Sequence, residues 1–246
     1  MKTKLVVTDL TRMYQGRICF AGYNDKQQCI RPVLPPPGIP EGNLYQNKKP
    51  IIFPFALIEL DLEKSIPEPP HTEDMQYYPM SVRFVRTVIN REEVLNWSLF
   101  DSAEEIFDQT VLEGPGYYVK ACQGSRSLGT IRPSKVIKAI YESGEEGTWD
   151  YRLSFINSSN RDYRLKITDL TWHYYCDSLR SEHRNPKQIA YELTKKLRNT
   201  KVYLRIGLAR GWKKFPDRCY LQITGIYTFP DYLDGKIFAD FSDSPQ

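Results

Sequence analysis

Residues 5–32 read LVVTDLTRMYQGRICFAGYNDKQQCIRP, and this stretch decides the fold class. It holds three short apolar runs, at 5–7, 17–21 and 28–30, which are separated by a Gln-Gly and an Asn-Asp turn signal. Apolar runs bounded by such turns are typical of strands in an antiparallel meander. We therefore expect β-structure from the beginning of the chain.

The same signals recur in the rest of the sequence. Strands are predicted at 53–62, 117–121, 135–141, 149–156, 163–168, 202–208 and 219–227. Two proline-rich segments, 35–42 and 67–70, are predicted to be loops, because proline removes a hydrogen-bond donor from a strand and glycine frees the backbone.

Helices are predicted in only two places. Within 90–112 apolar residues lie among acidic ones, and Ser102 with a glutamate three positions later has the form of a capping box. Two helical pieces should therefore meet near Asp101. Pro186 is predicted to begin another helix that continues to residue 198. The chain is thus expected to be mainly β with a few helices, a β-rich α+β class.

The acidic helical stretch is the expected divider of the chain. We predict a first small barrel over 1–90, a helical connector over 91–116, and a second barrel over 117–246 with an inserted helix. A length of 246 residues suits two small β domains, and a hydrophobic content of 41% is enough to fill ordinary cores.

Cysteine usage and hydropathy predict a cytoplasmic protein with no membrane partner. The five cysteines are far apart and form no C-x-x-C pair, which does not resemble a disulfide framework. The apolar run at the amino terminus turns polar at Thr8, which is too early for a signal peptide, and no apolar stretch of about 18 residues occurs.

Charge is unevenly distributed along the sequence. Residues 1–116 hold 12 Lys and Arg against 16 Asp and Glu, whereas 117–221 hold 21 against 10. The final segment, 222–246, holds 1 against 4. A basic segment of this size is expected of a protein that binds a phosphate backbone, although folding can also scatter such charges over the surface.

The loop between the last two predicted strands combines cations with aromatic residues. Its members are Arg210, Trp212, Lys213, Lys214 and Phe215. Single-stranded nucleic acid is held by this combination, because cations follow the phosphates while aromatic faces stack on bases. The alternative is that both aromatic side chains fold back to cap the barrel while the lysines stay solvated.

Four further residues are candidate nucleic-acid contacts. Arg31 and Arg132 each precede a proline, which fixes the chain next to a guanidinium that can bind phosphate. Equally, each can pair with a carboxylate such as Asp9 or Asp169. Arg126 lies in a Gly- and Ser-containing loop that lacks the lysine of a P-loop. Tyr174 belongs to an aromatic run, predicted to be a strand end, that offers a stacking platform.

No motif supports catalysis or a cofactor. His173, Cys176 and His183 invite a zinc site, but a structural site needs four ligands and no fourth lies nearby. Nucleophile-elbow, H-E-x-x-H, dinucleotide-binding, kinase and deaminase patterns are all absent. We therefore expect no catalytic residues, no metal and no cofactor.

Three segments carry a family resemblance. Residues 16–22 (GRICFAG), 30–33 (IRPV) and 203–210 (YLRIGLAR) resemble the prokaryotic dual OB-domain proteins. Cys29 stands where that family is expected to have tryptophan. The resemblance implies two OB-like barrels in one chain, a nucleic-acid-binding role, and a setting in prokaryotic defence or mobile elements.

The sequence thus predicts a non-enzymatic module that binds single-stranded or structured DNA or RNA. One alternative is a protein-interaction adaptor, in which the acidic stretch and the proline-rich segments dock a partner from the same operon. Another is a sensor that binds a nucleotide or a modified base.

Overall fold

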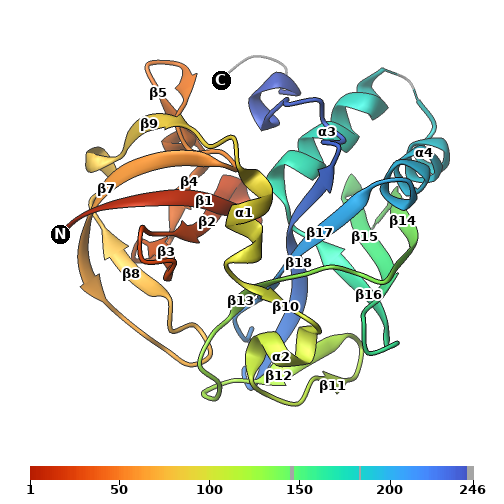
Figure 1. Ribbon diagram of the computed structural model, residues 1–246, viewed down its shortest axis with the longest axis horizontal. Coiled ribbons are helices and arrows are strands. Elements are labelled where there is room, and N and C mark those ends of the chain that lie inside the picture. Colours follow the sequence, from red (N-terminus) through yellow and green to blue (C-terminus); the bar gives the residue numbers. More distant parts are fainter. Residues whose placement is uncertain (145–146, 183, 243–246) are drawn as a thin grey trace.

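The computed structural model describes residues 1–144, 147–182 and 184–242. Two β lobes lie side by side, and the chain passes from one to the other through a short helical segment (Figure 1). The first lobe is coloured red to yellow and the second green to blue. Within the described ranges, no helix is both long and apolar enough to cross a membrane.

The first lobe is a closed barrel of five strands. Its hydrogen-bonded order is β1-β2-β3-β8-β7, and β7 pairs back to β1. Only β3 and β8 run parallel, and this strand order is that of the OB fold, a five-stranded Greek-key barrel. The strands of this lobe are β1 (Lys2–Arg12), β2 (Arg17–Tyr23), β3 (Cys29–Val33), β4 (Ile39–Pro40), β5 (Tyr45–Gln46), β6 (Lys49–Pro50), β7 (Ala56–Ser65), β8 (Asp74–Tyr77) and β9 (Arg83–Thr87).

The barrel begins where the sequence predicts a meander. Residues 5–11 of β1 are all buried, and alternate residues such as Leu5 and Val7 fill the barrel, whereas Val6 on the other face belongs to a separate cluster. At Gly22 the strands approach so closely that an added Cβ would lie 2.0 Å from the Val6 carbonyl oxygen. Only glycine fits at this crossing. One detail differs from the prediction, because the proline-rich loop contains β4 and a short 3-10 turn, Glu41–Leu44.

The second lobe repeats the strand path of the first. Its order β14-β15-β16-β18-β17 again contains one parallel pair, β16 with β18. Among the described residues no pairing joins β14 to β17, so the ring of hydrogen bonds is open there. The strands are β10 (Leu99–Phe100), β11 (Leu112–Glu113), β12 (Tyr117–Lys120), β13 (Leu128–Ile131), β14 (Lys135–Ser143), β15 (Trp149–Ile156), β16 (Asp162–Ile167), β17 (Lys201–Leu208) and β18 (Arg218–Phe229).

Of the four α-helices in the described part of the chain, three lie where the sequence predicts them. Helix α1 (Arg91–Asn96) and helix α2 (Ala103–Phe107) flank Asp101, and the Ser102 hydroxyl accepts a hydrogen bond from the Glu105 amide. Helix α4 (Pro186–Arg198) has proline in its first turn and is capped by the Asn185 side chain.

Helix α3 (Leu170–Ser181) corrects the prediction of a strand end around Tyr174. The Asp169 carboxylate accepts hydrogen bonds from the Thr171 and Trp172 amides, and thereby caps the helix. The aromatic run favoured a strand, but the cap directly before it decides the local structure.

Buried apolar residues form a core in each lobe. The first core is completed by two residues from late in the chain, Leu170 and Phe238, which belong to the same buried cluster as Leu10 and Ile18. A third cluster joins the lobes and contains Val6, Leu95 and Tyr203 among others. All five cysteines are free, as their spacing predicts.

Candidate nucleic-acid interface

The loop between β17 and β18 forms a compact hairpin end. Trp212 and Phe215 form an isolated β-bridge, and their rings meet edge to face with centroids 5.7 Å apart. Gly211 allows the loop to close, because a Cβ there would lie 2.2 Å from the Pro216 carbonyl oxygen. The side chain of Trp212 is nevertheless 53% exposed. Phe215 is half-buried against Trp212, Arg218 and Tyr220, whereas Trp212 stays exposed.

A second row of aromatic and cationic residues extends the hairpin surface onto β12. The Arg218 guanidinium lies 4.4 Å from the Phe215 ring centroid and 4.8 Å from that of Tyr118. Tyr118 in turn packs against Tyr220, with centroids 5.6 Å apart. The sequence patterns did not indicate Tyr118 or Arg218. Arg218 follows the loop by three residues, whereas Tyr118 reaches it only through the antiparallel pairing of β12 with β18.

The lysines of this surface carry uncompensated charge. Several other cations of the second lobe form ion pairs, as Arg152 does with Asp150 and Arg161 with Glu104. Lys213 and Lys214 are exposed, and no ion pair joins either to a carboxylate of the described residues. Their charge is therefore available to an anionic partner. We define the hairpin surface as Tyr118, Lys120, Trp212, Lys213, Lys214, Phe215, Arg218 and Tyr220.

Arg210 lies at the edge of the hairpin surface and reaches the first lobe. It forms ion pairs with Asp74 and, at 3.3 Å, with Glu68. Its charge is partly compensated, which the sequence pattern did not indicate. Arg210 thus connects the hairpin to the space between the lobes.

Arg31 lies inside β3 rather than after it. It is 6% exposed, and its Nε donates to Asp74 Oδ1 over 2.6 Å. Arg31 does pair with a carboxylate, as predicted, but this carboxylate belongs to Asp74. Asp9 pairs with Arg205 instead. The parallel pairing of β3 with β8 places Asp74 directly beside Arg31.

The other three predicted contacts lie apart from the hairpin surface. The Arg126 guanidinium packs over Phe100, and that of Arg132 packs over Tyr203. Tyr174 is half-buried in α3, where its hydroxyl donates to Glu41. Its ring therefore serves packing between the lobes rather than an open platform.

The suggested zinc ligands do not form a site in the described part of the chain. His173 is buried and bonded through Nε2 to the Ile167 carbonyl oxygen at 2.8 Å. Burial lowers the pKa of His173 to about 4, so its ring is neutral at pH 7. His183 lies outside the described residues, and within them no group of three potential ligands occurs.

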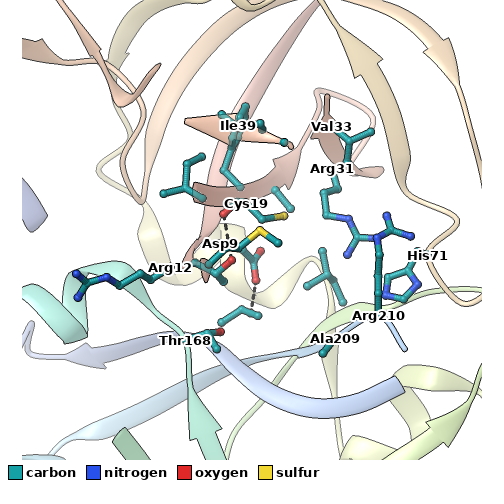
Figure 2. Close-up of a pocket in the computed structure, with 18 of the residues that line it drawn as sticks. Asp9, Arg12, Cys19, Arg31, Val33, Ile39, His71, Thr168, Ala209 and Arg210 are labelled. Atoms are coloured by element: carbon teal, nitrogen blue, oxygen red, sulfur yellow. Dashed lines mark hydrogen bonds between the residues drawn. The ribbon is translucent and has the colours of Figure 1, made fainter. Parts of the chain in front are cut away.

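A cavity of about 450 Å³ lies between the two lobes. Its walls come from β1, β2 and β3 on one side and from β13, β17 and β18 on the other. Figure 2 shows the Arg31 and Arg210 guanidinium groups side by side next to His71, with Arg12 on the opposite side of Asp9. Arg31 and Arg210 are thus the two predicted site residues that the fold brings together here.

A closed five-stranded barrel with OB topology, followed by a sheet of the same strand path, defines a protein of two OB-type lobes. The chain belongs to the dual OB-containing domain family, whose sequence profile matches residues 3–226. The resemblance found from three short segments therefore holds for nearly the whole chain. No curated protein matches the sequence.

Proposed function

We propose that this protein is a non-enzymatic module that binds single-stranded nucleic acid across the hairpin surface. The observation that carries the proposal is the exposed Trp212 ring next to Lys213 and Lys214, neither of which has an ion pair within the described residues. Bases of a single strand are free to stack on such a ring, whereas those of a duplex are already stacked on one another. OB-type barrels commonly bind oligonucleotides, which agrees with this assignment.

The arrangement suggests how a strand would lie. Phosphates would follow Lys213, Lys214 and Lys120, while one base stacks on Trp212. The edge-to-face contact with Phe215 holds the indole in place, so little side-chain freedom remains to be lost on binding. No base-specific contact is needed, and the expected preference is for strandedness rather than for sequence.

Titration of labelled oligonucleotides tests the proposal. Single-stranded DNA and RNA should bind at low salt, and Trp212→Ala should weaken binding by about five- to a hundredfold, as loss of one stacking contact implies. Tyr78→Ala is the matched control, because Tyr78 is equally exposed at 52% but lies beside Glu63 on the acidic first lobe. The proposal fails if wild-type protein binds neither polymer, or if the two variants bind alike.

A further inference from the structure

The cavity between the lobes lies on the face where OB barrels usually hold their ligands. That face is formed by the second and third strands of the barrel and by the loops after its first and fourth strands. Here β2 and β3 supply Cys19 and Val33, the β1–β2 loop supplies Tyr14, and the β7–β8 loop supplies His71. The cavity is thus a ligand face in its position on the first barrel.

The second lobe covers this face. Leu208 and Ala209 at the end of β17, with Gln222 of β18, form the opposite wall. The β7–β8 loop is fixed to the second lobe, because His71 Nε2 donates to the Leu208 carbonyl oxygen over 3.1 Å. The second lobe therefore narrows the access of a polymer to the barrel at this position. The remaining volume of about 450 Å³ lies within the usual range of small-molecule sites, roughly 300–1,000 Å³.

One end of the cavity suits an anion. Arg31 and Arg210 share the single carboxylate of Asp74, and each guanidinium has five N–H donors, more than this carboxylate can engage. The second partner of Arg210, Glu68, is 75% exposed and pairs with it only at 3.3 Å. An anion with several acceptor oxygens can therefore bind both arginines after Glu68 moves into solvent.

The pKa of His71 reflects the positive potential at the arginine end of the cavity. The pKa of His71 is lowered to about 4, first by burial and next by Arg31 and Arg210, whose effects exceed that of Asp74. His71 is consequently neutral at pH 7 and adds no charge. Glu73 also lies near Arg31 but is engaged by the Ser127 amide and hydroxyl.

The rest of the cavity suits a planar ring system with a polar edge. Val33, Ile39 and Leu128 provide apolar walls. The side-chain amide of Gln222 makes no hydrogen bond to another described residue, and an amide can pair with both a donor and an acceptor of a base edge. At the rim, Tyr14 is 85% exposed on a turn fixed by the left-handed residues Gln15 and Gly16.

We propose that the cavity between the lobes binds a nucleoside monophosphate. The base lies between the apolar walls with its edge at Gln222, and the phosphate lies at Arg31 and Arg210. This site is separate from the hairpin surface, and it does not depend on the binding of a polymer there.

Calorimetric titration of the full chain tests the proposal. The probes are the ribo- and deoxyribonucleoside 5′-monophosphates, the matched nucleosides, and inorganic phosphate. At least one monophosphate should bind with 1:1 stoichiometry, about tenfold or more tightly than its nucleoside and than phosphate, because only the whole nucleotide engages both ends. Absence of saturable binding by every monophosphate overturns the proposal, as does equally tight binding of phosphate alone.

Variants locate the binding. Val33→Phe fills the cavity and should lower the affinity for the monophosphate by about tenfold or more. Val85→Phe is the matched control, because Val85 is 44% exposed on β9 and does not line the cavity. Gln222→Ala, which needs no extra space, should weaken binding by about threefold or more through loss of a hydrogen bond. If Val33→Phe folds and binds the monophosphate as the wild type does, the ligand lies elsewhere and the proposal is contradicted. If Val33→Phe does not fold, unchanged binding by Gln222→Ala has the same meaning.

A last variant separates this inference from the proposed function. Trp212→Ala should bind the monophosphate as the wild type does, since Trp212 does not line the cavity. Oligonucleotide binding without monophosphate binding would refute the inference alone. Monophosphate binding without oligonucleotide binding would refute only the proposed function.

Discussion

Arg205 and Asp9 form a buried ion pair that joins the two lobes, with Arg205 Nη2 2.8 Å from Asp9 Oδ2. Arg205 is 0% exposed and Asp9 2%. Arg205 Nη1 donates to the hydroxyl groups of Tyr23, Ser98 and Thr130, and Asp9 also accepts from the Thr224 hydroxyl. Both charges thus have hydrogen-bond partners besides each other, which is the condition under which a buried pair is tolerated.

Replacement of one partner should therefore be costly. Arg205→Met leaves the Asp9 carboxylate buried without its countercharge and should lower the free energy of unfolding by about 3–5 kcal/mol. Urea unfolding at pH 7 measures this change. The double variant Asp9→Leu with Arg205→Met should regain part of the loss. A single variant as stable as the wild type would show that the pair contributes nothing.

Stability should depend on the titration of Asp169. Burial raises its pKa to about 7 despite three backbone amide donors, whereas an unfolded aspartate titrates near about 3.9. The folded state therefore binds more protons between these values, and this contribution to stability is lost as the pH rises from about 4 through 7.

Asp169→Asn isolates the effect of Asp169. His71 and His173 also titrate on unfolding, but the variant still carries both, so their contributions cancel in the comparison with the wild type. The wild-type minus variant free energy of unfolding should decrease from pH 5 to pH 7, by at most about 1.4 kcal/mol per pH unit. Denaturant unfolding at pH 5, 6, 7 and 8 gives the slope. A difference independent of pH would mean that Asp169 is ionised throughout.

The lysines of the hairpin surface should set the salt dependence of oligonucleotide binding. Lys213→Gln and Lys214→Gln should each reduce the slope of log affinity against log salt by about 0.7, the value for one phosphate contact on a single strand. Arg126→Gln, whose guanidinium packs over Phe100 outside the hairpin surface, should leave the slope unchanged. Equal slopes in all three variants would argue against phosphate contacts by these lysines.

The strand crossing at Gly22 should tolerate no side chain. Gly22→Ala places a Cβ against the Val6 carbonyl oxygen and should destabilise the protein by about 1–3 kcal/mol or more. Gly42→Ala is the control, since a Cβ there meets nothing within 4 Å. Thermal unfolding compares the two, and equal melting temperatures would show that β1 and β2 separate easily at this point.

Local sequence patterns predicted most elements of the fold. The meander in 5–32 became β1 to β3, and Ser102 and Pro186 marked helix starts where the structure has them. Helix α3 was missed because aromatic residues suit strands and helices alike, so that the capping Asp169 decided between them.

The candidate site was only partly predictable. Trp212, Lys213 and Lys214 are neighbours in sequence, and their shared loop could be recognised. Tyr118 meets that loop only through strand pairing, which no local pattern reports. Arg31 could be recognised from its local motif. Its pairing with Asp74, however, follows from the parallel register of β3 and β8, which the sequence does not reveal.

The position of Phe238 bears on how the protein is made. This residue is fully buried in the core of the first barrel, yet a ribosome completes that barrel's strands long before it reaches residue 238. The nascent first lobe therefore exposes part of its core throughout synthesis of the second. Contacts of such long sequence separation slow folding and prolong exposure to aggregation. Cellular yield should thus depend on the carboxyl-terminal segment as much as on the barrel that it closes.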